Sequence, residues 1–139
     1  MSGYAEILYL TIAMIVFAML SINTATNFNN SRQNLYRVEV EYRAIAVAQD
    51  ELDKVQWIYD DDELDPTDGS YVYTNYPLTE THNYGSSDQY SDDFVIYAES
   101  ELIVDTGSQK RYQVSVSVLN QNVDPEVFIT LDYVKSYSY

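Results

Sequence analysis

The feature that most constrains this chain is an uncharged apolar run close to its N-terminus. No charged residue occurs from Ile7 to Ser31, and the part from Ile7 to Ile22 is almost entirely apolar. One carboxylate, Glu6, precedes the run, and the first basic residue is Arg32. A helix needs ~20 apolar residues to cross a bilayer, and a slightly shorter one is accommodated by tilt or local thinning. The run therefore predicts a helix whose side chains are covered by lipid or by other helices.

Two general interpretations explain this run incompletely. A secretory signal peptide has a basic start and a small-x-small cleavage site. Asn23–Ala25 matches such a cleavage site weakly, but the start of the chain is acidic and not basic. A plain membrane anchor fits the length, yet Arg32 and Arg37 would place the following side in the cytoplasm. The domain that follows is acidic, free of cysteine and rich in tyrosine, which is more typical of an exterior domain. Neither interpretation accounts for Glu6, since an intramembrane acid normally has a partner.

The third interpretation rests on a resemblance to a protein family. The stretch "MSGYAEILYLTIAMIVFAML", with Gly3 just before a single glutamate, resembles the mature N-terminus of type IV pilins and pseudopilins. The downstream stretch "EYRAIAVAQDELDKVQ" is similar to the second helical half of pseudopilins and minor pilins. The resemblance covers roughly residues 1–57 in pattern, and the rest only in element order. It implies a basic leader that a dedicated peptidase removes; the family glutamate is the fifth mature residue, whereas Glu6 is the sixth residue here.

The resemblance implies that the apolar helices of many copies pack into a filament core. The residues expected to pack there are Ile7, Leu8, Leu10, Ile12, Met14, Ile15, Phe17 and Leu20. A buried Glu6 needs a cation, and an α-amino group with a pKa of ~8 is mostly charged at neutral pH. We therefore expect Glu6 of an incoming subunit to pair with the Met1 amine of another copy and to set the axial register. Alternatively, Glu6 lies at headgroup level, where an acid complements the helix dipole.

A second, amphipathic half is expected to continue the helix. No Pro or Gly occurs between Gly3 and Pro66, but the Asn/Thr-rich stretch 23–31 has poor helix propensity and predicts a local unwinding. Two shorter helices joined by a loop at 23–34 are the alternative. Beyond it, apolar residues recur at three- and four-residue steps and predict one buried stripe. That stripe consists of Leu35, Val38, Tyr42, Ile45, Ala48, Leu52 and Val55.

The C-terminal part predicts an antiparallel sheet of about four strands. A short strand is expected at "SYVYTNY", followed by alternating strands at "DFVIYAESELIV", "RYQVSVSVL" and "EVFITLDYVKSYSY". The buried face would carry Phe94, Ile96, Ala98, Leu102, Val104, Val114, Val116, Val118, Val127, Ile129, Leu131 and Tyr133. The fold class is therefore α+β, with the long helix packed on the sheet. The expected parts are a hydrophobic helix 1–27 and a head 28–139, divided into helix 32–58, acidic loop 59–92 and sheet 93–139.

Charge and motifs narrow the chemistry of the head. A formal net charge of -15 argues against nucleic acid as a partner, since phosphate binding needs clustered basic residues. The loop acids Asp60, Asp62, Asp65 and Asp68 allow a weak calcium hypothesis, although the EF-hand spacing is not met. The motif at Asn29 is a glycosylation sequon. The only histidine, His82, has no spaced partner, no catalytic motif is present, and we expect neither an enzyme nor a cofactor.

These observations predict a structural subunit of an extracellular type IV pilus-like filament serving adhesion, motility or surface attachment. Its expected partners are further copies of itself in a helical homopolymer, the inner membrane before assembly, and a pilus assembly machinery. Two alternatives stay open. One is a single-span anchored extracellular binding domain, and the other is a pseudopilin or minor pilin of a type II secretion-like machine.

Overall fold

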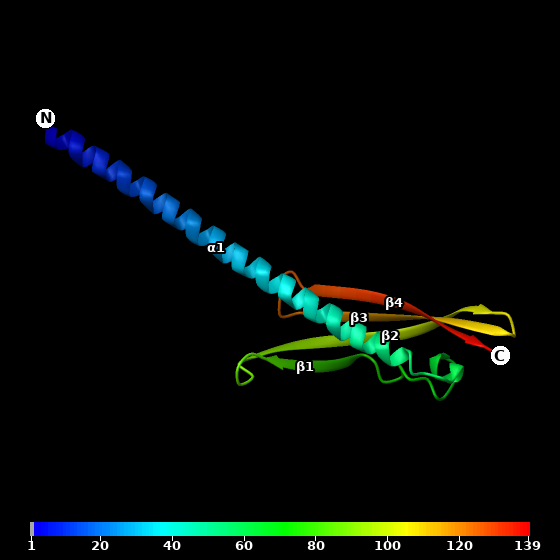
Figure 1. The fold of residues 1–139 in the computed structure, drawn as a ribbon. Coiled ribbons are helices and arrows are strands. Elements are labelled where there is room, and N and C mark those ends of the chain that lie inside the picture. Colours follow the sequence, from blue (N-terminus) through cyan, green and yellow to red (C-terminus); the bar gives the residue numbers. More distant parts are fainter. Residues whose placement is uncertain (1) are drawn as a thin grey trace. The chain divides into compact units, whose positions relative to one another are not determined.

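The computed structural model describes residues 2–139 and shows one long helix followed by a four-stranded sheet (Figure 1). The elements in order are α1 (Ser2–Val55), the 3-10 helix η1 (Asp61–Leu64), β1 (Leu78–Tyr84), β2 (Tyr90–Asp105), β3 (Gln109–Asn120) and β4 (Val127–Ser138). Two compact units divide between Val38 and Glu39. This boundary lies inside α1, and the division expected between residues 27 and 28 stays a prediction.

The described residues of the first unit, 2–38, are all helical, including the Asn/Thr-rich stretch. The local unwinding expected at 23–31 and the alternative loop at 23–34 are therefore both wrong. Threonine hydroxyls here bond to carbonyls one turn back, from Thr24 Oγ1 to Leu20 O at 2.8 Å and from Thr26 Oγ1 to Ile22 O at 2.9 Å. A hydroxyl satisfied in this way does not compete for the backbone in a non-helical conformation.

The second unit contains an antiparallel meander in the order β1-β2-β3-β4. Val116 on β3 faces Ala98 on β2 and Leu131 on β4. The register shifts between Leu102 and Val104, where Ile103 has no partner on β3. Leu102 pairs with Tyr112 before this shift and is 41% exposed instead of buried, and the bulge then interrupts the regular alternation expected on β2.

The core lies between one face of the sheet and the last turns of α1. Val114, Val116 and Val118 are fully buried, as expected, and Val127 is nearly so. Ile129, Leu131 and Tyr133 pack at the edge of this core. The α+β fold, with the helix packed on an antiparallel sheet, is therefore confirmed.

The helix presents a different face to the sheet from the one expected. The residues of α1 that are buried are Val40, Ala44, Val47, Ala48, Glu51, Leu52 and Val55. The last part of the expected stripe is thus correct, but Leu35 and Tyr42 are 70% and 68% exposed. Ala44 and Ala48 have small side chains, so this face of the helix can pack close to the sheet. The larger residues Leu35 and Tyr42 lie on the exposed face.

The segment between α1 and β2 also differs from expectation. The strand expected at 70–76 is a series of turns, and β1 lies at Leu78–Tyr84, inside the expected acidic loop. The sheet therefore begins at residue 78 and not at residue 93. The turns are closed by Thr74 Oγ1, which donates to Tyr71 O at 2.7 Å, while Tyr73 packs edge-on against Tyr71 and Tyr76.

Candidate functional site: an exposed apolar helix and the anchor of the head

The apolar run is uncovered within a single chain. Every described side chain from Gly3 to Ile22 is exposed, and Phe17 is 72% exposed. All eight residues expected in a filament core share this exposure: Ile7, Leu8, Leu10, Ile12, Met14, Ile15, Phe17 and Leu20. By length and composition α1 is able to cross a membrane, a test that signal sequences also pass. Burial of these side chains must come from lipid or from another chain, because exposed apolar area of this extent is unfavourable in water.

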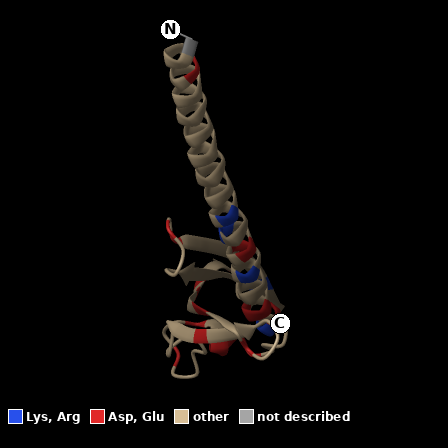
Figure 2. Cartoon of the chain, turned by 90° about the vertical axis from the view of Figure 1, so that its left-hand side faces the viewer, with Lys and Arg blue, Asp and Glu red and all other residues tan. Residues whose placement is uncertain are grey.

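Glu6 is the only charged residue on α1 before Arg32, and Figure 2 shows the uncharged stretch that separates them. Its side chain is exposed, and the first turn of α1 contains no acidic residue. The alternative role, in which Glu6 lies at headgroup level and complements the helix dipole, stays a prediction. The expected partner amine belongs to Met1, which lies outside the described residues. The hydroxyl of Thr11, within the run, is satisfied by Ile7 O at 2.8 Å.

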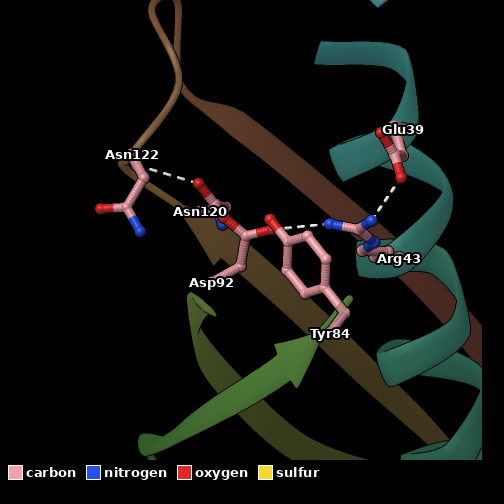
Figure 3. Close-up of polar contacts among 6 residues, drawn as sticks. All are labelled: Glu39, Arg43, Tyr84, Asp92, Asn120 and Asn122. Carbon is pink, nitrogen blue, oxygen red and sulfur yellow. Dashed lines mark hydrogen bonds and ion pairs between the residues drawn. The ribbon is translucent and has the colours of Figure 1, made fainter. Parts of the chain in front are cut away.

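A buried polar cluster attaches the start of the second unit's helix to the sheet (Figure 3). Asp92 on β2 is 1% exposed and accepts hydrogen bonds at Oδ2 from Arg43 Nη1 at 3.0 Å and from the Tyr84 hydroxyl at 2.8 Å. The Arg43 guanidinium lies 3.5 Å above the centre of the Tyr84 ring and also pairs with Glu39. Burial lowers the pKa of Arg43, but bonds to Tyr84 and Asp92 outweigh it and raise the pKa overall. The cluster fixes the rotation of α1 against β1 and β2.

A second polar contact holds α1 near its C-terminal end. Glu51 is 4% exposed and accepts from the Tyr76 hydroxyl at 2.6 Å, and it also pairs with Lys54. Burial, followed by the bond to Glu51, raises the pKa of Tyr76 above its usual range. The tyrosine is therefore a neutral donor throughout the physiological pH range. Together with the Arg43 cluster, this contact holds the part of α1 that belongs to the second unit against the sheet.

Beside the Arg43 cluster, Asn120 at the end of β3 is fully buried. Its Oδ1 accepts from the backbone N–H of Asn122 at 2.9 Å, as Figure 3 shows. Its Nδ2 has no hydrogen-bond partner among the described residues. The side chain therefore shapes the connection from β3 to β4.

The acidic loop is organised mainly by its own hydrogen bonds. Asp65 Oδ1 accepts from the N–H and hydroxyl of Thr67 at 2.9 and 2.7 Å, and Asp68 accepts likewise from Ser70. These bonds lower the pKa of both carboxyls. Of the residues named for calcium, only Asp60 and Asp62 lie together, with Asp61, within 4.8 Å. Asp65 and Asp68 are outside that group, so the structure does not bring the four residues together.

Asp61 ties this loop to the sheet and to the chain end. Its Oδ2 accepts from Lys110 Nζ on β3 at 2.6 Å. Hydrogen bonds from Lys110 and Tyr139 lower the pKa of Asp61, and the bond to Asp61 raises the pKa of Tyr139 to about 12. Desolvation and then the charges of Asp60 and Asp61 raise the pKa of Asp62. The cluster therefore has one acid that is strongly paired and one that is crowded by like charges.

The remaining residues that the sequence singles out lie apart from these contacts. Asn29 is exposed on α1. His82 lies on β1, 43% exposed, with Nε2 3.2 Å from Glu80 Oε2 and its ring edge-on to Phe94. Glu39 and Arg43 are four residues apart, a spacing that favours an ion pair on a helix, whereas Asp92 is 49 residues from Arg43. Asp92 falls at the end of the expected acidic loop 59–92, so the sequence did not predict its burial.

No protein-family model matches this chain, and neither the curated proteins nor the solved structures compared with it contain a match. The class is therefore defined by the structure itself. It is an α+β protein with a long N-terminal apolar helix that packs through its second part on a four-stranded antiparallel sheet, an arrangement compatible with a pilin-like fold.

Proposed function

We propose that this chain is the structural subunit of an extracellular type IV pilus-like filament that serves adhesion, motility or surface attachment. The observation that carries the proposal is the combination found on α1. An apolar run that is exposed along its whole length, with Glu6 at its head, continues without interruption into a helix that forms the core of an antiparallel head. In this proposal the same helix serves first as a membrane anchor and then as a filament core.

Assembly then consists of exchanging lipid for protein. Before assembly, subunits reside in the inner membrane as single-span proteins. An assembly machinery then extracts them from the membrane and adds them to a helical filament. Apolar side chains such as Leu8 and Phe17 leave lipid and pack against the same segment of neighbouring copies. Since lipid tails are as apolar as these side chains, packing and polar pairing must supply the specificity.

Glu6 is the residue that supplies the register in this proposal. A carboxylate buried among apolar helices is unfavourable unless a cation meets it, and the amine of a neighbouring copy's Met1 is the proposed cation. A slip along the filament axis would leave both charges buried without a partner.

Further apolar residues on α1 support contact between copies beyond the run. Leu35, Tyr42 and Ile45 are exposed, at 70%, 68% and 40%. Their recurrence at three- and seven-residue steps is typical of a helix face that packs on a neighbour. A single-span anchored domain with no partner would gain nothing from this second set of apolar side chains.

The test is the replacement Glu6→Ala, with Glu6→Gln as the variant of matched shape. We expect both to insert normally in the membrane but to reduce filament yield at least about tenfold, since losing ~1.4 kcal/mol at each interface already gives that factor. Yield is measured by shearing filaments from the host surface, and insertion by resistance of the membrane fraction to carbonate extraction. Asp50→Asn, the loss of an exposed charge on the same helix, is the control. Unchanged filament yield in Glu6→Ala would refute the register role.

A further inference from the structure

The face of the sheet opposite α1 has an ordered pattern of side chains. Because successive residues of a strand point to opposite faces, the residues that alternate with the buried core lie on this face. The register places Tyr97, Ser117 and Thr130 in one row, and Glu99, Ser115 and Asp132 in the next. Ser117 and Thr130 share a hydrogen bond of 2.9 Å, and Ser115 donates to Asp132 Oδ1 at 2.6 Å. The small serines of β3 thus form a low floor between taller side chains.

A groove of about 670 Å³ occupies this floor. Its lining includes Tyr97, Glu99, Ser115, Ser117, Glu126 and Phe128. Tyr97 and Phe128 are 43% and 57% exposed, so their rings remain accessible. A smaller polar pocket of about 250 Å³ shares Glu99 and Ser115 and adds Glu101. The two neighbouring pockets are thus lined by aromatic and carboxylate groups.

The charge of the groove is of one sign. Glu99 and Glu126 line it, Glu101 lines the adjoining pocket, and no Lys or Arg is found among the described lining residues. None of these three glutamates makes a hydrogen bond or ion pair to any described residue, in contrast to Asp92 and Asp61, which face Arg43 and Lys110. The groove therefore combines unneutralised carboxylates with accessible aromatic rings.

We propose that this groove binds an arginine-bearing segment of a partner polypeptide. A guanidinium stacks on aromatic faces such as that of Tyr97 and donates in a fork to carboxylates such as Glu99. The Ser115 hydroxyl donates its hydrogen bond to Asp132, so its oxygen can still accept a hydrogen bond from a further N–H. A phosphate or other anionic ligand is disfavoured by the same carboxylates. The site is complete in a single copy, so it does not depend on filament formation.

The test is calorimetric titration of the full chain, in neutral-detergent micelles at low salt, with a short oligoarginine peptide blocked at both ends. The matched probe is the same peptide with citrulline, which keeps the side-chain shape and removes the charge. Glu99→Gln should weaken oligoarginine binding about fivefold, the change expected when one exposed charge pair is lost. Tyr97→Leu, which keeps an apolar wall and removes the ring, should weaken it by a similar factor. Unchanged near-ultraviolet circular dichroism verifies that each variant is folded.

Asp50→Asn is the control, since it makes the same charge change on an exposed position of α1. Weakening by Glu99→Gln that clearly exceeds weakening by Asp50→Asn supports the proposal. Equal effects of the two variants would assign the binding to net charge and overturn it. Equal binding of the citrulline and arginine peptides would also overturn the proposal. Self-association of the chain that is abolished by Glu99→Gln would overturn it as well, because it would assign the groove to a second copy.

Discussion

The cluster around Arg43 makes the clearest prediction about stability. Replacing Arg43 with Met keeps most of the aliphatic stem but removes the cation that faces Asp92, a carboxylate with 1% exposure on β2. The replacement also removes the stacking of the guanidinium 3.5 Å above the Tyr84 ring. Since these contacts hold α1 against β1 and β2, their loss should destabilise the head without changing the apolar run.

The magnitude follows from the burial of the two partners. Removing one partner of a buried ion pair costs ~3–5 kcal/mol when the other charge is left fully stranded. Arg43 is 25% exposed, and the Tyr84 hydroxyl keeps its 2.8 Å bond to Asp92. We therefore expect a loss below that range, about 2–3 kcal/mol including the cation–π contact. For a small domain this is a large part of a total free energy of unfolding of ~5–15 kcal/mol.

The assay is urea unfolding of the full chain in neutral-detergent micelles, followed by near-ultraviolet circular dichroism of the buried tyrosines. Asp92→Asn, alone and combined with Arg43→Met, completes a double-mutant cycle. We expect a coupling free energy of about 1–2 kcal/mol, because Arg43 and Asp92 interact directly, at 3.0 Å. If Arg43→Met lowered the free energy of unfolding by less than about 0.5 kcal/mol, or the two effects were additive, the anchoring role would be refuted.

Three further predictions concern the packing, the acidic loop and a turn. Val47→Ala should cost about 1.5–2.5 kcal/mol in urea unfolding, and Ile45→Ala less than about 1 kcal/mol, because Val47 is 5% and Ile45 40% exposed; the reverse order would contradict the assigned helix face. Hydrogen bonds from Lys110 and Tyr139 lower the pKa of Asp61 below its usual 3.8. The ionised carboxylate therefore stabilises the folded state above pH 3.8, and this stabilisation is lost as the pH falls through the folded-state pKa. Asp61→Asn should therefore melt at a lower temperature than the parent at pH ~5, and the two curves should converge near pH ~2; a constant difference would contradict this. Gly107→Ala should cost about 1–2 kcal/mol through strain alone, because φ is 77° and an added Cβ meets nothing within 4 Å; a neutral effect on unfolding would exclude the left-handed turn.

Regular patterns explain which parts of the fold were predictable. Strict alternation at Val114, Val116 and Val118 identified both the strand and its buried face, because a strand has only two faces. On the helix the same kind of reasoning failed for the first half of the stripe. Apolar residues at Leu35 and Tyr42 recur as regularly as those at Val40 and Ala44, so periodicity alone cannot say which face the sheet covers.

Other features depend on contacts between distant residues. β1 was missed because "LTETHNY" is largely polar, and its strand conformation depends on pairing with β2. The expected strand at 70–76 had stronger local signals, but its tyrosines pack on each other and on the helix instead. The threonines at 24 and 26 have poor helix propensity, yet they are helical, and their hydroxyls bond to carbonyls of the preceding turn.

The apolar run with Glu6 could be predicted from the sequence, whereas the groove could not. Glu6 and the run that follows it were recognisable from the sequence, since an unbroken apolar run with one acid is a local pattern. The groove was not, because Tyr97, Ser117 and Phe128 come from three strands and meet only through the register. An alternation of serines with buried valines on β3 indicates an open face, but not the aromatic walls on either side.

The most direct test of the filament proposal is the structure of filaments isolated from the host surface, determined by electron cryomicroscopy with the subunit identified by mass spectrometry. We predict filaments built from this chain, in which residues 7–22 of neighbouring copies contact one another in the core and the Glu6 carboxylate lies within ~3 Å of the amine of another copy. Filaments that lack this chain, or a chain found only as single copies with residues 7–22 in lipid, would contradict the proposal.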